Sequence, residues 1–147
     1  MLADYDPHGI AIMSTYKYGS QRLFHENYHL NVATIKWLGV KSSDIHSNIL
    51  NSNEQDDQGL LRLTANDRKK ATKMLENNAA FAEDGAEGEW RRELQVMLML
   101  GVKAEMEILD RNGADIGLWV NERLRLFNNT GKKLPHIGAE GPKDMHV

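Results

Sequence analysis

Two aspartates stand near the start of the 147-residue chain, in the stretch LADYDPHG. Asp4 and Asp6 are spaced i, i+2, and residues with this spacing on an extended segment point to the same side. Two carboxylates aimed at one spot repel each other, and a divalent cation between them removes that repulsion. Mg²⁺ prefers hard oxygen ligands and commonly takes one or two protein carboxylates together with phosphate oxygens. The pair is therefore a candidate Mg²⁺ site beside a phosphate-containing substrate.

The same aspartates also have a purely structural interpretation. Asp6 is a good N-cap for a helix whose first residue is Pro7, and Asp4 would then be an ordinary acid at the end of a strand. A third alternative is the phosphoaspartate hydrolase pattern Asp-x-Asp-x-Thr/Val, although His8 stands where Thr or Val is needed. The residue types and spacing leave these interpretations open.

A second motif, HENYH, matches the His-Glu-x-x-His pattern of zinc proteases. That chemistry needs His25 and His29 on one face of a stable helix, Glu26 as general base and a third ligand elsewhere. Asn27 and Tyr28 are weak helix formers, and no later residue stands out as the third ligand. We therefore favour a surface loop that contacts DNA or a partner subunit.

The composition narrows the class of protein. Eighteen basic and 21 acidic residues give a net charge of −3, so no overall basic field indicates nucleic acid. The absence of cysteine excludes disulfides and thiolate metal sites, and it fits a reducing compartment such as the cytosol or the nucleus. No apolar run approaches the roughly 20 residues of a membrane helix, so no membrane is expected. The start has no basic region typical of a signal peptide.

The hydrophobic pattern predicts an α/β domain with a short, mostly parallel sheet flanked by helices. Residues 1–127 are expected to form this domain, with a polar, exposed insertion at 42–59, and residues 128–147 a flexible tail. Lys103 and Glu107 would form a surface pair on the longest helix. The predicted elements are a strand stub at 1–4, a helix from Pro7 to Gly19, a strand at 33–40, and helices at 63–78, 90–109 and 114–127.

Basic and hydroxyl side chains follow the acid pair and could contact DNA phosphates. Lys17, Ser20 and Arg22 lie on the first predicted helix or just after it. A second basic run lies on the helix predicted at 63–78 and could meet a DNA backbone by electrostatics. For both sets, a solvated helix surface is the commoner interpretation. The second run consists of Arg68, Lys69, Lys70 and Lys73.

Several longer stretches occur in one order along residues 2–126 and together resemble the C-terminal part of the topoisomerase VI A-subunit family. The resemblance is nearest to its eukaryotic meiotic branch, which makes the double-strand breaks that start recombination. It implies a TOPRIM-type domain that binds Mg²⁺ through Asp4 and Asp6, with Asp4 the more direct ligand. It also implies DNA as substrate, a nuclear, chromosomal location, a homodimer, and a topoisomerase VI B-like partner subunit. The stretches are LADYDPHGIAIMSTYKYGS, LNVATIKWLGVKSSDI, LTANDRKKATKMLE, WRRELQVMLMLGVKAEMEIL and WVNERL.

The resemblance further implies a type II topoisomerase chemistry in which a tyrosine attacks a backbone phosphate and becomes joined to a 5′ end. In the family that tyrosine, and a glutamate of the metal cluster, belong to segments that precede the acid motif. None of the chain's tyrosines matches the nucleophile, so we expect a fragment that lacks its N-terminal sheet edge and is inactive alone. The alternative is a non-catalytic DNA- or partner-binding module from a truncated paralogue. The tyrosines are Tyr5, Tyr16, Tyr18 and Tyr28.

A missing neighbour strand would expose unpaired backbone groups at a sheet edge. We therefore predict that the isolated chain is marginally stable or prone to aggregation. Thermal unfolding followed by circular dichroism measures this, and a sharp, reversible transition above about 60 °C would contradict the prediction.

Overall fold

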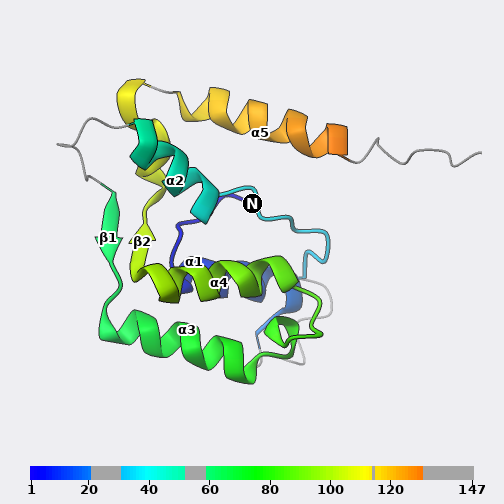
Figure 1. Cartoon of the computed structure of the whole chain (residues 1–147). Helices are drawn as coiled ribbons and strands as arrows, with labels where there is room; N and C mark the ends of the chain where they lie inside the picture. Colours follow the sequence, from blue (N-terminus) through cyan, green and yellow to red (C-terminus); the bar gives the residue numbers. More distant parts are fainter. Residues whose placement is uncertain (21–30, 52–58, 114, 131–147) are drawn as a thin grey trace, which may run out of the picture.

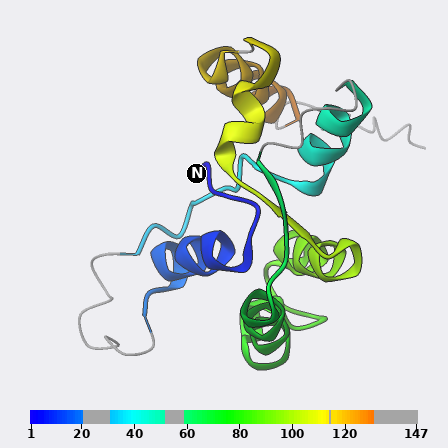
Figure 2. The same ribbon diagram turned by 90° about the vertical axis from the view of Figure 1, so that its left-hand side faces the viewer.

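The computed structural model describes residues 1–20, 31–51, 59–113 and 115–130. Helices α1, α3 and α4 gather at one end of two short strands, and α2, η4 and α5 lie at the other end (Figures 1 and 2). The elements in chain order are α1 (Pro7–Tyr18), α2 (Ser42–Asn51), β1 (Leu60–Arg62), α3 (Ala65–Asn77), η3 (Ala79–Phe81), α4 (Gly88–Leu100), β2 (Val102–Ala104), η4 (Met106–Gly113) and α5 (Ile116–Thr130).

The N-terminal residues form an extended segment at the centre of the backbone pairing. Tyr5 and Ala104 of β2 form an antiparallel bridge, with N···O distances of 2.8 and 3.0 Å. On the other side, Ala3 donates to the carbonyl of Gly39 at 2.8 Å, and Val40 donates to the carbonyl of Ala3 at 2.8 Å. Residues 1–5 therefore have hydrogen-bond partners on both sides, which is not the weak edge expected from the sequence.

The ladder in the described residues is antiparallel, so the structure does not support a mostly parallel sheet. β1 pairs with β2, with Leu60 opposite Ala104. The strand predicted at 33–40 contributes a single parallel bridge, between Leu2 and Gly39. Its β-branched and aromatic residues reflect burial of Trp37 and Val40 rather than a ladder, because strand propensity largely measures fit to a half-buried surface.

Helix α1 begins as the sequence predicts. The side chain of Asp6 accepts a hydrogen bond from the backbone N–H of Gly9 at 2.5 Å, and Pro7 occupies the first helical position. A Cβ at Gly9 would lie 2.5 Å from the carbonyl oxygen of Asp4, so the DPHG turn needs glycine there. Gly19, with a φ of 85°, ends the helix as predicted.

Helix α3 has the predicted capping arrangement at its start. The hydroxyl of Thr64 accepts from the N–H of Asp67 at 3.1 Å, and a carboxylate oxygen of Asp67 accepts from the N–H of Thr64 at 2.9 Å. This reciprocal pair is a capping box and satisfies two helix-end donors.

The prediction of one long helix over residues 90–109 is wrong beyond Leu100, where α4 ends. Gly101 adopts the left-handed conformation with a φ of 70°, and its N–H donates to the carbonyl of Met97, which ends α4. The chain then turns into β2, so Lys103 and Glu107 are not a helix-surface pair. The apolar stripe before this stop packs into the core as predicted, with Trp90, Leu94 and Met97 all buried.

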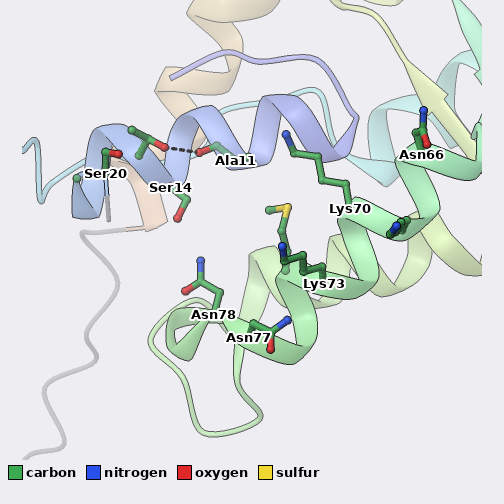
Figure 3. A pocket seen from close by; sticks show the side chains of 12 residues that line it. Ala11, Ser14, Ser20, Asn66, Lys70, Lys73, Asn77 and Asn78 are labelled. Atoms are coloured by element: carbon green, nitrogen blue, oxygen red, sulfur yellow. Dashed lines mark hydrogen bonds between the residues drawn. The ribbon is translucent and has the colours of Figure 1, made fainter. Parts of the chain in front are cut away.

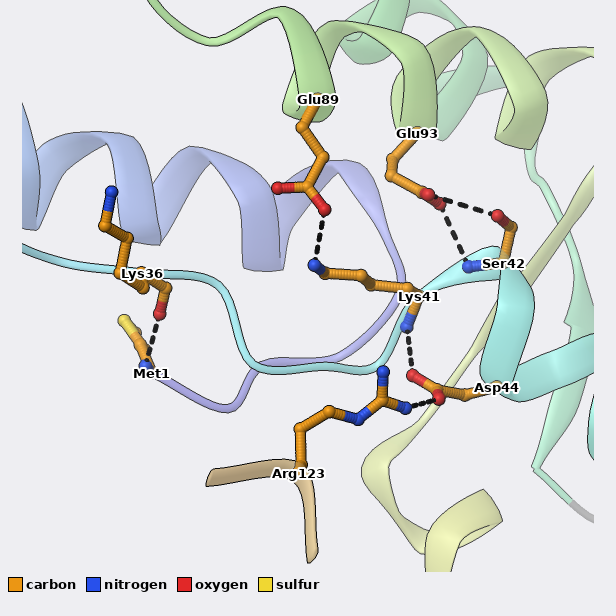
Figure 4. Close-up of polar contacts among 8 residues, drawn as sticks. All are labelled: Met1, Lys36, Lys41, Ser42, Asp44, Glu89, Glu93 and Arg123. Carbon is orange, nitrogen blue, oxygen red and sulfur yellow. Dashed lines mark hydrogen bonds and ion pairs between the residues drawn. The ribbon is translucent and has the colours of Figure 1, made fainter. Parts of the chain in front are cut away.

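The polar stretch at 42–59 contains helix α2, whereas the sequence predicted an exposed insertion. The carboxylate of Glu93 accepts from the backbone N–H of Ser42 at 2.9 Å and from its hydroxyl at 3.1 Å (Figure 4). Asp44 accepts from the N–H of Lys41 and also pairs with Arg123 of α5. The helix start is therefore stabilised by α4 and α5, which local composition does not reveal. Residues 52–58 lie outside the described part of the chain.

The last helix forms where it was predicted but extends to Thr130, three residues past the expected domain end. Residues 131–147, most of the predicted tail, lie outside the described residues. In the described part, no helix has the length and apolar character needed to span a membrane.

The core connects both ends of the molecule. Trp90 contacts Trp37 edge-on and Phe81 at a tilt, with ring centroids 6.3 Å apart in each pair. The largest side chains with almost no exposed surface are Trp37, Tyr5, Phe81, Ile10, Met13, Leu94, Met97, Ile108, Val40 and Pro7.

Replacing the helix cap gives a direct test of this description. Thr64→Ala should lower the free energy of unfolding by about 1 kcal/mol because it removes the acceptor for the Asp67 N–H. Thr72→Ala, the same change on the exposed surface of α3, is the matched control and should cause no loss. Urea unfolding measures both, and equal stability of the two variants would contradict the assignment.

Candidate functional site

The two aspartates lie where the central extended segment passes into α1. One oxygen of Asp4, Oδ1, accepts the backbone N–H of Met106 at 2.9 Å, which joins the segment to the start of η4. One oxygen of Asp6, also Oδ1, caps α1. Within the described residues, Oδ2 of each carboxylate has no hydrogen-bond partner. Each side chain is therefore oriented by one oxygen, while its other oxygen has no partner among the described residues.

A partly buried ion pair lies next to this acid pair. The ammonium group of Lys103 on β2 donates to Oδ2 of Asp67 on α3 at 2.8 Å, and the Asp67 side chain is only 5% exposed. The nearby carboxylates of Asp6 and Glu105 also favour the charged form of Lys103. The neighbourhood of the aspartates is thus acidic, with one lysine neutralising part of it.

The ion pair shifts the pKa values of both Asp67 and Lys103. The hydrogen bond from Lys103 is the main cause that lowers the pKa of Asp67 from 3.8 to about 2, and its bonds to Thr64 add to the effect. The same hydrogen bond raises the pKa of Lys103 above its usual value. Both groups are therefore charged at neutral pH, and neither serves as a proton donor or acceptor there.

The structure describes two of the three residues predicted for DNA contact, Lys17 and Ser20. Lys17 pairs with the buried carboxylate of Glu87, and its ammonium lies 5.4 Å from the centre of the Trp90 ring. Ser20 lies on the wall of a groove between α1 and α3. Arg22 lies outside the described residues, as does the HENYH motif. Their contact with DNA stays a prediction, and the Lys17 ammonium already has a carboxylate partner.

Two of the three described tyrosines, Tyr5 and Tyr18, are poorly suited to nucleophilic attack. Tyr5 is completely buried and donates to the backbone carbonyl of Glu93 at 3.1 Å. Burial, reinforced by the Glu93 carboxylate, raises its pKa far above the ordinary value of 10. Burial and a hydrogen bond to Glu87 raise the pKa of Tyr18 to about 12. Tyr16 is more than half exposed, and Tyr28 lies outside the described residues.

Tertiary structure brings together a set of polar residues that the sequence did not connect. A groove between α1 and α3 is lined by lysines of α3 and by hydroxyl and amide side chains (Figure 3). The lysine run on α3 was noted from the sequence. Ser14 carried no signal, because only the packing of α1 on α3 places it opposite the lysines, whereas Asn77 and Asn78 lie at the end of α3 itself.

Comparison with known proteins decides the family. The family model for the Toprim domain of Spo11 and the topoisomerase 6 A-subunit matches residues 1–119, which include both aspartates and the whole of α1, α3 and α4. The chain belongs to this Spo11/topoisomerase 6 family. The resemblance found in the sequence is thereby confirmed, and the α/β fold is that of its Toprim domain.

Individual relatives agree with the family assignment. The meiotic recombination protein SPO11-1 of Oryza sativa subsp. indica is 41% identical over 108 residues, which cover 74% of this chain and 26% of that protein. Human meiotic recombination protein SPO11 is 37% identical over 108 residues, covering 74% and 25%. The A-subunit of DNA topoisomerase 6 from Arabidopsis thaliana is 33% identical over 112 residues, covering 76% and 24%. The chain spans about a quarter of the length of these Spo11 and topoisomerase relatives.

The Asp67–Lys103 pair predicts how the stability of this Spo11-family domain depends on pH. Because the pKa of Asp67 falls from 3.8 to about 2 on folding, its contribution is complete above 3.8 and is lost as the pH falls toward 2. Asp67→Asn should therefore be less stable than the wild type near neutral pH, and the difference should shrink below pH 3.8.

Urea unfolding over a pH series measures this difference. The matched control is Asp84→Asn, which removes one exposed carboxylate from the turn before α4 and should track the wild type at every pH. The prediction would be contradicted if the wild type and Asp67→Asn differed in unfolding free energy by the same amount at every pH.

Proposed function

We propose that this chain is the metal- and DNA-binding part of a Spo11-type protein that forms double-strand breaks in meiotic recombination. The acid pair carries the proposal, because two carboxylates at the start of α1 each keep Oδ2 without a partner in the described residues. That arrangement suits Mg²⁺, whose binding is general for Toprim domains. The proposal places the protein on chromosomes in the nucleus, with DNA as substrate.

The two carboxylates supply only part of the ligand set that Mg²⁺ needs, so other ligands must complete the site. The described residues contain no group of three acidic or histidine side chains that could hold a metal ion. Asp4 and Asp6 would supply two hard oxygen ligands, and waters and phosphate oxygens would supply the others. Bound there, Mg²⁺ would neutralise charge on the phosphate during transesterification. Asp4 remains the more direct ligand in this proposal and Asp6 the second.

The aspartates are also oriented for this role by their own hydrogen bonds. The Met106 N–H fixes Asp4 and the Gly9 N–H fixes Asp6, so little side-chain freedom is lost when an ion binds. Lys103 and Asp67 lie beside them and balance part of the negative charge. Other parts of the complete protein would supply the attacking tyrosine. A type II break of both strands would use two copies of the protein, and a topoisomerase VI B-like chain is the proposed partner.

One observation favours the alternative of a non-catalytic partner-binding module. Helix α5 has no buried residue, and it exposes several large apolar side chains, while its link to the domain includes the Arg123–Asp44 pair. A second chain could cover that surface without any catalysis. The exposed apolar residues of α5 are Ile116, Leu118, Leu124, Leu126 and Phe127.

Mg²⁺ titration by calorimetry tests the metal role. Asp4→Asn and Asp6→Asn keep an oxygen that can accept the Met106 or Gly9 N–H but lose the negative charge, so the fold should persist while Mg²⁺ affinity drops strongly. Asp84→Asn removes an equal charge elsewhere and should bind like the wild type. Equal Mg²⁺ binding by wild type and Asp4→Asn would refute the metal role.

The 147-residue chain should not form a covalent adduct with DNA. Its buried or hydrogen-bonded tyrosines, Tyr5 and Tyr18, have raised pKa values and are protonated at neutral pH. Incubation with labelled supercoiled DNA and Mg²⁺, followed by denaturing electrophoresis, measures adduct formation. A labelled protein–DNA band that disappears in Tyr16→Phe would show that this part carries its own nucleophile and would overturn the prediction.

A further inference from the structure

The groove between α1 and α3 carries a concentrated positive charge. It has a volume of about 650 Å³ and is lined on the α3 side by Lys69, Lys70 and Lys73 (Figure 3). No aspartate or glutamate is among its lining residues, although acids outnumber bases by 21 to 18 in the chain. The local field is therefore opposite in sign to the net charge of the protein, which favours an anionic ligand.

Among the described residues, no aspartate or glutamate forms an ion pair with the lysines of this groove. Lys69 and Lys73 are separated by one helical turn, where like charges weaken a helix. In the described part of the chain, neither forms an ion pair or hydrogen bond through its side chain, and Lys70 contacts the His8 ring at 3.0 Å. A bound anion would relieve the repulsion that the fold leaves in place.

The groove runs along both helices, and its lining starts at Ala11 of α1 and Asn66 of α3. His8, two residues after Asp6, lies 3.0 Å from Lys70 and 3.8 Å from the carboxylate of Asp67. The other end is lined by Ser20 and Asn78, which lie just beyond the C-terminal ends of α1 and α3. Helices of 12 and 13 residues extend about 18–20 Å, which matches about five base pairs of DNA along the axis.

We propose that the α1–α3 groove binds the sugar–phosphate backbone of duplex DNA and leads it away from Asp4 and Asp6. Lys69 and Lys73 would neutralise phosphates, and the Ser14 hydroxyl would donate to phosphate oxygens. The length of the groove favours a polymer over a single small anion. This inference deepens the proposed function, on which it rests, by adding a second DNA contact apart from the metal ligands.

Salt-dependent DNA binding by the full 147-residue chain tests the proposal. Fluorescence anisotropy with a short labelled duplex is measured in EDTA over a NaCl series, so Mg²⁺ plays no part. Lys69→Gln/Lys73→Gln should reduce the slope of log affinity against log salt by about 1.8 and weaken binding by up to about 60-fold near 0.1 M salt. Its unfolding free energy should be equal to or above that of the wild type, because a like-charge pair is removed.

The matched control is Lys36→Gln/Arg92→Gln, which removes two exposed positive charges outside the groove. It should leave the salt slope close to that of the wild type. An equal loss in both double variants, or no DNA binding by the wild type at low salt, would overturn the proposal. The proposal would also be overturned if Lys69→Gln/Lys73→Gln lost binding to phosphatidylglycerol vesicles but bound DNA like the wild type. The groove would then bind a lipid surface.

The two proposals fail in different ways. Asp4→Asn should bind DNA in EDTA at least as well as the wild type, because it removes a negative charge and leaves the groove lysines in place. Absent Mg²⁺ binding with intact lysine-dependent DNA binding would refute the metal role alone. Normal Mg²⁺ binding with no effect of the two lysines would refute the groove alone.

Discussion

The backbone pairing of residues 1–5 holds the two ends of the molecule together. Ala3 pairs with Gly39 and Val40 on one side, and Tyr5 pairs with Ala104 on the other. The buried ring of Tyr5 also reaches the carbonyl of Glu93 on α4. Because unpaired buried backbone groups are costly, this segment has one register, and that register determines where Asp4 and Asp6 leave it.

Around this segment, ion pairs connect elements that are distant in the sequence. Asp67 of α3 meets Lys103 of β2, Glu87 meets Lys17 of α1, and Asp44 of α2 meets Arg123 of α5 (Figure 4 shows the last pair). Breaking one partner of a largely buried pair leaves an uncompensated charge, so each pair constrains the relative placement of two elements. The groove lysines differ from these because no acid in the described residues faces them. That contrast between matched and unmatched lysines supports an external anionic partner.

Local signals identified the helices whose starts and stops are encoded in neighbouring residues. The Asp6 cap with Pro7, and the Thr64–Asp67 box, each involve side chains and backbone groups within three residues. The stop at Gly101 was not predicted, because the apolar pattern beyond it indicated a helix continuing to Leu109. The backbone conformation of one glycine outweighed that periodicity, because the αL conformation ends the helix before β2.

The family, the acid pair and the capped starts of α1 and α3 could be predicted from the sequence alone, because motifs and caps involve residues close together in the chain. Only the folded chain decided the antiparallel pairing, the formation of α2 and the construction of the α1–α3 groove. These features join residues far apart along the chain: Glu93 stabilises the start of α2 from 51 positions away, and His8 meets Lys70 from 62 positions away. Such contacts are selected by the total burial and charge pairing of the fold, which no short stretch of sequence specifies.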